Sequence, residues 1–232
     1  NYNDKYEYVF PEITFDKNLI SNEKIGSLDL QTNYKARKYD TNKFTNFLVN
    51  NFLWNYKEIN HASGFTSKIL ANIKNINYES KNVDIYKKDT TTEVLGAIGY
   101  LTELDLIKEV SGSKHFLTPK FLLRFAPGSM RKETDGSKLD VINAFSMNRV
   151  DNNYNFESGF SGTVGFDYKI KKGEKDLDFS VAQIINEKEN KKMASKTSLD
   201  EKLSDLFGSA KYEINEKVNL NYNFSIDQNY SD

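Results

Sequence analysis

The stretch of sequence that decides the fold is Phe156-Glu-Ser-Gly-Phe160-Ser-Gly-Thr-Val164-Gly-Phe-Asp-Tyr168-Lys-Ile170. Its even positions hold bulky apolar or small residues, and its odd positions hold polar or small ones. Side chains of an extended strand alternate between two faces, so this period of two predicts one amphipathic β-strand along the whole stretch. A strand in a soluble sheet usually has about 5 to 6 residues, whereas a tilted membrane-crossing strand needs about 9 to 11. The length therefore favours the wall of a membrane barrel.

The same alternation returns on both sides of this stretch. Downstream it predicts strands at residues 177–181, 206–214 and 218–226, with Asn215-Glu216-Lys217 as a hairpin turn. Upstream it predicts strands at residues 28–37 and 117–125, and Pro119 is expected near a strand end or a bulge because proline donates no ladder hydrogen bond. Residues 46–56 and 64–78 are also predicted to be strands, but the sequence does not show which of their side chains lie on which face of the sheet. Exposed loops are expected at the polar stretches 87–92, 130–138, 171–175 and 187–196.

These segments predict a two-faced sheet. At about 10 residues per strand plus a turn, the chain should hold on the order of 10 to 12 strands. We expect Phe156, Phe160, Val164, Phe166, Tyr168 and Ile170 to share a lipid-exposed face. Ser161, Thr163 and the row Asn219, Asn221 and Asn223 should face water. The predicted fold class is an all-β, antiparallel transmembrane β-barrel, with residues 1–232 forming a single segment.

Composition narrows the function classes. The chain has Tyr 14 and Phe 16 beside Pro 3, which favours strands, and a formal net charge of -1, which gives no one-signed field for nucleic acid. With Cys 0, disulfides and thiolate metal sites are excluded. Apolar runs such as residues 94–101 are far shorter than the roughly 20 residues of a spanning helix. Asn1 begins no signal-like segment, so we expect a mature segment or a fragment whose signal lies elsewhere.

No constellation of residues indicates catalysis. His61 and His115 stand alone in the sequence, without the spacing that places two metal ligands on one face. Ser204-Asp205 and Asp135-Gly-Ser137 have no histidine nearby to complete a triad. The acidic segments 84–88, 176–178 and 187–189 lack the glycine-containing spacing of a calcium loop. We therefore predict no catalytic residue, no metal, no cofactor and no enzyme activity.

Several local phrases resemble one known family. They are Phe10-Pro-Glu-Ile-Thr-Phe15, Asp40-Thr-Asn-Lys43, His115-Phe-Leu-Thr-Pro-Lys120, Arg124-Phe-Ala-Pro-Gly128 and Asn143-Ala-Phe-Ser-Met-Asn-Arg149, followed by Gly162-Thr-Val-Gly-Phe-Asp-Tyr168, Val181-Ala-Gln-Ile184, Ser198-Leu199 and Ser204-Asp-Leu-Phe-Gly208. In type and order they resemble the barrel region of LptD, the outer-membrane lipopolysaccharide-assembly protein also called organic solvent tolerance protein. The Asn and Lys richness resembles an alphaproteobacterial version.

The resemblance implies a function and partners. Members of the family insert lipopolysaccharide into the bacterial outer membrane, receive it from a periplasmic Lpt bridge and hold a plug lipoprotein similar to LptE. Two departures are the missing amino-terminal jelly roll and the missing cysteines. We expect an interior arc of a large barrel, incomplete at both ends. Pro119 and Arg149 are interpreted as structural, in a bulge and in a solvated lumen or rim, and no lipopolysaccharide-binding residue is assigned.

Two other functions fit the same alternation. A general or substrate-specific outer-membrane porin would show the same strand pattern and would differ only in the phrases quoted above. A soluble β-rich surface or adhesin domain would instead pack its apolar faces against a second sheet. Extraction that requires detergent would separate this last reading from both barrels.

Overall fold

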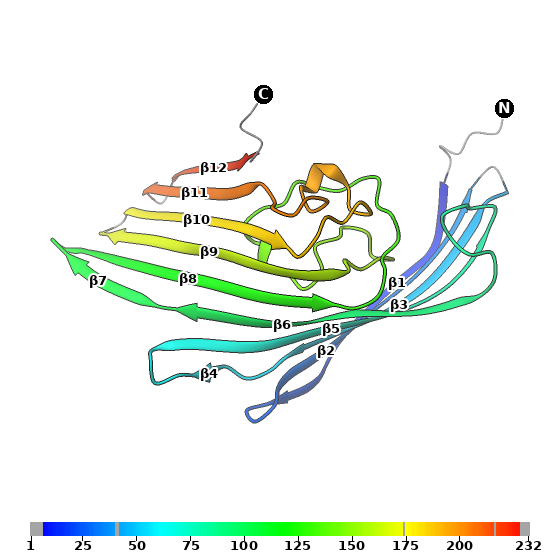
Figure 1. The fold of residues 1–232 in the computed structure, drawn as a ribbon, viewed down its shortest axis with the longest axis horizontal. Helices are drawn as coiled ribbons and strands as arrows, with labels where there is room; N and C mark the ends of the chain where they lie inside the picture. Colours follow the sequence, from blue (N-terminus) through cyan, green and yellow to red (C-terminus); the bar gives the residue numbers. More distant parts are fainter. Residues whose placement is uncertain (1–6, 40–41, 174, 216, 228–232) are drawn as a thin grey trace.

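The computed structural model describes residues 7–39, 42–173, 175–215 and 217–227 and contains one large antiparallel sheet. Twelve strands belong to this sheet, and neighbours in space are nearly always neighbours in sequence. The order is β1-β2-β3-β5-β6-β8-β9-β10-β11-β12, with β4 paired to β5 and β7 paired to β8. Within the described residues the path from β1 to β12 does not close, and the sheet curls around loops that lie on one of its faces (Figure 1).

The strands are long. Their bounds are β1 (Glu7–Asn22), β2 (Gly26–Tyr39), β3 (Phe44–Asn55), β4 (Ile59–Asn60), β5 (Phe65–Lys81), β6 (Thr91–Leu104), β7 (Leu106–Val110), β8 (Ser113–Ala126), β9 (Gly159–Lys172), β10 (Lys175–Asn186), β11 (Leu206–Asn215) and β12 (Val218–Ile226). Two short 3₁₀ helices, η1 (Asn143–Phe145) and η2 (Ser195–Thr197), lie in the loops after β8 and β10. The ten strands of the main path have from 9 to 17 residues, beyond the usual length in soluble sheets.

The predicted strands are confirmed in kind and order. Alternation located β2, β8, β10, β11 and β12, and the mixed stretches around residues 46–56 and 64–78 are β3 and β5. The up-and-down order expected for the last four strands is β9 to β12. Of the predicted turn after β11, Glu216 lies outside the described residues. The all-β antiparallel sheet is therefore established, while barrel closure and membrane insertion remain proposals.

Pro119 lies at a break in the ladder of β8. The pairing of β8 with β6 ends at Lys120 opposite Glu103, and its pairing with β7 begins at Leu117 opposite Leu106. Pro119 falls between these two points and is paired only on its other side, with Phe166 of β9. The missing N–H of proline therefore falls where the partner strand changes, as expected for proline within a sheet.

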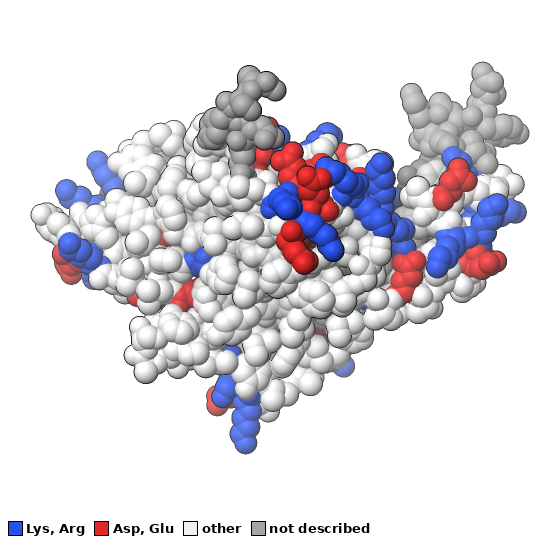
Figure 2. All heavy atoms as spheres, in the orientation of Figure 1, with Lys and Arg blue, Asp and Glu red and all other residues white. Residues whose placement is uncertain are grey.

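The two faces of the sheet differ sharply in chemistry. We call the loop-covered face the inner face and the other the outer face, and assign each strand residue by alternation along the printed registers. From β2 to β11 the charged residues on the outer face are confined to strand ends and the short β7: Lys38, Glu79, Lys81, Lys108, Lys172 and Lys175. Figure 2 shows charged side chains gathered over the loops and hairpin ends, with a broad uncharged surface between them.

One sequence prediction about the deciding stretch is wrong. Strand β9 begins at Gly159, not at Phe156, and Phe156 is buried, with Ala97 and Ala126, against the inner face. Gly159 has a φ of 122°, a conformation that favours glycine, and the chain changes direction there before the strand begins. Phe160 and Val164 do lie on the outer face and are exposed. The alternation of apolar and polar residues thus extends by coincidence from β9 back into the loop before it.

Two glycines of β9 make a matched pair for testing this geometry. A Cβ at Gly165 would lie 2.4 Å from the backbone oxygen of Val181 in β10, whereas one at Gly162 would make ordinary contacts with the side chains of Phe121 at 3.6 Å and Leu123 at 3.9 Å. We expect Gly165→Ala to lower the free energy of unfolding by about 1–3 kcal/mol, because the neighbouring backbone must move. Gly162→Ala should change it by less than about 0.5 kcal/mol. Equilibrium urea denaturation measures both, and equal effects would contradict this packing.

Candidate functional site

Two long loops cover the inner face. The inner loop, residues 127–158, joins β8 to β9, and the second loop, residues 187–205, joins β10 to β11. Apolar residues of both loops pack together with the inner-facing residues of β10 and β11, in one buried cluster: Met130, Leu139, Ala144, Ala182, Ile184, Met193, Leu199 and Phe207. The loops therefore form a packed layer on the sheet. The expectation that residues 130–138 and 187–196 are simply exposed is wrong for Met130, Met193 and Ala194, which are buried.

The tip of the inner loop crosses to the opposite part of the sheet. Tyr154 stacks on Phe47 of β3, with ring centroids 3.9 Å apart, and joins a buried cluster with Val49, Ile76 and Tyr78. The ammonium group of Lys74 in β5 donates to the backbone oxygen of Asn153 at 3.2 Å. The loop thus spans the inner face from β10 to β3, which encloses it within the curl of the sheet.

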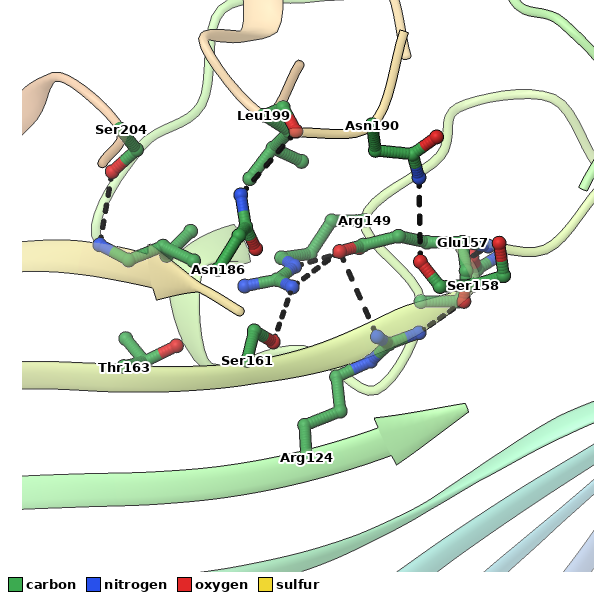
Figure 3. Close-up of polar contacts among 12 residues, drawn as sticks. Arg124, Arg149, Glu157, Ser158, Ser161, Thr163, Asn186, Asn190, Leu199 and Ser204 are labelled. Atoms are coloured by element: carbon green, nitrogen blue, oxygen red, sulfur yellow. Dashed lines mark hydrogen bonds and ion pairs between the residues drawn. The ribbon is translucent and has the colours of Figure 1, made fainter. Parts of the chain in front are cut away.

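A buried ion cluster holds the end of the inner loop to β8 and β9 (Figure 3). Arg149 and Glu157 are both in the loop, and Arg149 Nε donates to Glu157 Oε2 at 2.7 Å while its Nη2 donates to Ser161 Oγ of β9 at 2.9 Å. Arg124 of β8 places Nη1 3.6 Å from Glu157 Oε1 and donates through Nε to the Met147 backbone oxygen at 2.7 Å. One carboxylate therefore serves two buried guanidinium groups.

Electrostatics keeps Glu157 ionised in this cluster. Burial by itself would raise the pKa of the Glu157 carboxyl, but the positive charges of Arg149 and Arg124 outweigh burial and hold that pKa below its ordinary value of 4.5. The side chains of Arg124 and Glu157 are 1% and 4% exposed, so solvent screens their attraction weakly. A buried pair of this kind is strongly destabilising when one partner is removed.

Beside the loops, the inner face leaves a hollow of about 930 Å³ between β6 and β12, lined by polar and charged side chains together with apolar ones such as Leu101, Phe116 and Phe145. Its wall carries charges of both signs in cross-strand pairs: Lys120 Nζ lies 2.5 Å from Asp167 and 3.4 Å from Glu103, and Lys169 Nζ lies 3.1 Å from Asp178. Asn221 and Asn223 of β12 lie on its rim and are exposed, but so are Leu220 and Tyr222 on the other face of this strand, and the water-facing row stays a prediction. This hollow could accept a polar, hydrogen-bonding group such as a sugar or a hydrated solute.

The residues that the sequence analysis considered and set aside as site residues lie in different parts of the structure. His61 is hydrogen-bonded to Ser67 Oγ at 2.7 Å, and His115 to Tyr168 Oη at 2.7 Å, on different hairpins. Ser204 donates to the Asp205 backbone oxygen in the second loop. Asp176 and Asp178 both pair with Lys169 on the inner face. In the described part of the chain, no group of three or more His, Asp or Glu side chains is arranged to hold a metal ion.

Three expectations about solvation are wrong. Ser161 and Thr163, expected to face water, are 2% and 1% exposed, because the inner loop covers them, and Thr163 Oγ1 donates to the Ala144 backbone oxygen at 3.0 Å. Arg149, expected in a solvated lumen or rim, is 4% exposed in the ion cluster. Glu157 was not singled out at all. The sequence nevertheless held a sign of its role, because Glu157 is a carboxylate within an alternating apolar stretch, two residues before Gly159.

No family model matches this chain, and no curated protein matches it either. Among the described residues, no helix is both long and apolar enough to cross a membrane.

Replacing Glu157 tests the ion cluster. We expect Glu157→Gln to weaken docking of the inner loop by about 3–5 kcal/mol, because two buried guanidinium groups lose their counter-charge. Hydrogen exchange of the amides of residues 147–158 should accelerate while β9 stays protected. The matched control is Glu189→Gln in the second loop. This substitution should not change the exchange of residues 147–158 measurably, because the ion pair between Glu189 and Lys191 is exposed. Equal exchange in the two variants would contradict the role of the cluster.

The lowered pKa of Glu157 also predicts an acid dependence. A carboxyl whose pKa is lower in the folded state stabilises that state fully above its unfolded value, 4.5, and loses this effect as the pH falls through the folded pKa. The protection factors of residues 147–158, in which the intrinsic pH dependence of amide exchange is divided out, should therefore be constant above pH 4.5 and fall below it. In the Glu157→Gln variant this fall below pH 4.5 should disappear, and its persistence there would assign the acid response to other groups.

Proposed function

We propose that this chain is part of the wall of a bacterial outer-membrane β-barrel and that the protein delivers lipopolysaccharide into the outer membrane, in the manner of the LptD family. The single observation that carries the membrane part is the distribution of charge between the two faces. A charge on the lipid-facing side of a barrel is unfavourable by about 2–4 kcal/mol for Lys or Arg at the bilayer midplane. Between β2 and β11 the outer face carries charges only at strand ends and on β7 and so avoids that loss, whereas Lys17 in β1 does place a charge on this face.

The apolar outer face also argues against a soluble sandwich. Large apolar side chains on this face are exposed along the sheet, among them Ile13, Phe15, Ile73, Ile98, Phe125, Phe160, Val164, Leu220 and Tyr222. A soluble protein rarely leaves so extended an apolar surface open to water. Trp54 lies near a hairpin end and donates to the Ile25 backbone oxygen at 2.9 Å, a position typical of aromatic residues at a membrane interface.

The lengths of the connections give the sheet an orientation. At one end the strands are joined by short turns, such as residues 23–25 and 111–112, and at the other end by the inner loop and the second loop. Outer-membrane barrels have short periplasmic turns and longer extracellular loops. We therefore place the short turns in the periplasm and the two loops on the cell-surface side, where they narrow the lumen.

The lipopolysaccharide part is supported by where the family-like phrases fall in the fold. The phrases Arg124–Gly128 and Asn143–Arg149 contribute the residues that fasten the inner loop: Arg124, Ala144, Met147 and Arg149 all make the contacts described above. In addition, Asn148 Oδ1 accepts a hydrogen bond from the Glu157 backbone N–H at 3.0 Å. These phrases therefore coincide with one structural unit, and the hollow beside it offers both charged groups and apolar surface to an amphipathic molecule. The plug lipoprotein and the periplasmic bridge remain partners implied by resemblance.

A porin is the second candidate. The observation that favours it is the inner wall itself, where Lys120, Asp167, Lys169 and Asp178 place charges of both signs beside an inward-folded loop. Charged rings at a constriction select among small solutes. Depletion of the protein in its host separates the two functions. Loss of lipopolysaccharide from the cell surface with normal solute uptake supports export, whereas normal surface lipopolysaccharide with reduced uptake of small solutes supports the porin.

A charge placed on each face tests the membrane assignment directly. Val164→Lys puts an ammonium group on the outer face of β9, and we expect a loss of about 2–4 kcal/mol if that site is near the midplane. The amount of folded protein in the outer membrane should fall accordingly. Asn223→Lys puts the same charge on the inner face of β12, where Asn223 lines the hollow, and assembly should be nearly unchanged. Similar assembly of both variants would contradict a lipid-facing outer surface.

A further inference from the structure

One part of the outer face is basic, at the ends of β7 to β10 near their short turns. We call it the lysine rim and define it as Lys108, His115, Lys172 and Lys175. All four lie on the outer face, and the other charges of these strands, Glu109, Asp176 and Asp178 among them, fall on the inner face by alternation. The turn between β9 and β10 also contains Glu174, which lies outside the described residues.

The pairing within the lysine rim places two ammonium groups directly opposite each other. Lys172 is the cross-strand partner of Lys175, whereas Lys108 is the partner of His115. Like charges in directly opposed positions destabilise a sheet. Among the described residues no ion pair neutralises Lys108, Lys172 or Lys175. The nearest described carboxylate on β10, Asp176, pairs with Lys169 and Lys171 on the inner face. An external anion would relieve this repulsion.

A hollow of about 410 Å³ opens at one side of the lysine rim, beside Lys108 and His115. Leu106, Val110 and Leu117 form its apolar part, and Leu106 and Val110 are 46% and 43% exposed. Its polar part is Lys108 together with the hydrogen-bonded pair His115 and Tyr168. An apolar hollow edged by an ammonium group, an imidazole and a phenol matches a molecule with an acyl chain and an anionic head.

We propose that the lysine rim binds the phosphate headgroup of an anionic phospholipid in the periplasmic leaflet, with an acyl chain against Leu106, Val110 and Leu117. This inference rests on the proposed membrane-facing outer surface, but not on lipopolysaccharide as the transported molecule. Lysine stems lie along apolar surface while the ammonium groups reach the headgroup level, and Tyr is favoured at the same depth. Each lysine near an anionic membrane surface strengthens binding by about fivefold.

Lipid retention measures this site. The purified full-length protein is reconstituted in vesicles of phosphatidylcholine containing phosphatidylglycerol with the same acyl chains, extracted gently, and its bound lipids are counted by native mass spectrometry. The test variant is K172Q/K175Q. The matched control is K38Q/K81Q, which removes two exposed outer-face lysines at the opposite strand ends. A parallel sample contains inorganic phosphate as a soluble competitor.

We expect the wild-type protein to retain phosphatidylglycerol in preference to phosphatidylcholine. The K172Q/K175Q variant should retain it more than about tenfold less, and the K38Q/K81Q control should equal the wild type. Equal retention of the two lipids, unchanged retention in K172Q/K175Q, or equal loss in K38Q/K81Q would each overturn the proposal. Displacement by inorganic phosphate would overturn it too, by assigning a free-phosphate site. Flotation of the vesicles after an alkaline wash separately tests whether the protein is embedded in the membrane. Wild-type protein that does not float refutes the proposed membrane-facing outer surface. Protein that floats without lipid selectivity refutes only the proposed lipid site at the lysine rim.

Discussion

The separation of charge between the two faces of the sheet is the constraint on which the rest of the structure depends. Alternation sends each strand residue to one face or the other, so an outer face that between β2 and β11 carries charge only at strand ends and on β7 forces the other charged residues onto the inner face. There Lys120 meets Asp167, and Lys169 meets Asp178, in pairs between adjacent strands. A sheet that excludes charge from one side must accommodate and neutralise it on the other.

The inner loop is one means of accommodating those charges. Arg124 and Lys74 project from the wall toward the inside, and both bind backbone oxygens of the loop, Met147 for Arg124 and Asn153 for Lys74. Glu157 supplies the carboxylate that the wall lacks at this point. The loop is therefore held both by these buried ionic contacts, which are strongly destabilising when one partner is removed, and by the apolar cluster that contains Met130 and Ala144.

The alternation of apolar and polar residues correctly predicted those features of the fold that depend on neighbouring residues in the sequence. The strands β8 to β12, their antiparallel order and the break at Pro119 follow from alternation and from the missing N–H of proline. The predictions that failed concern contacts between residues that are far apart in the sequence. The burial of Ser161 and Thr163 results from a loop that returns across the sheet, and no period-two pattern records that return. Phe156 preserved the alternation while lying in the loop, so only the positive φ at Gly159 marks the true start of β9.

The central claim is that the outer face meets lipid and the inner face meets water or loops. A nitroxide label placed in turn at each position of β9, in protein reconstituted in vesicles, measures this directly through collisions with oxygen, which concentrates in lipid, and with a water-soluble nickel chelate. The account predicts a period of two: oxygen access at Phe160, Val164 and Tyr168, nickel access at Asp167 and Lys169, and neither at Ser161 or Thr163 because the inner loop covers them. Uniform access along the strand, or protection of the outer positions from both reagents, would contradict a lipid-facing wall.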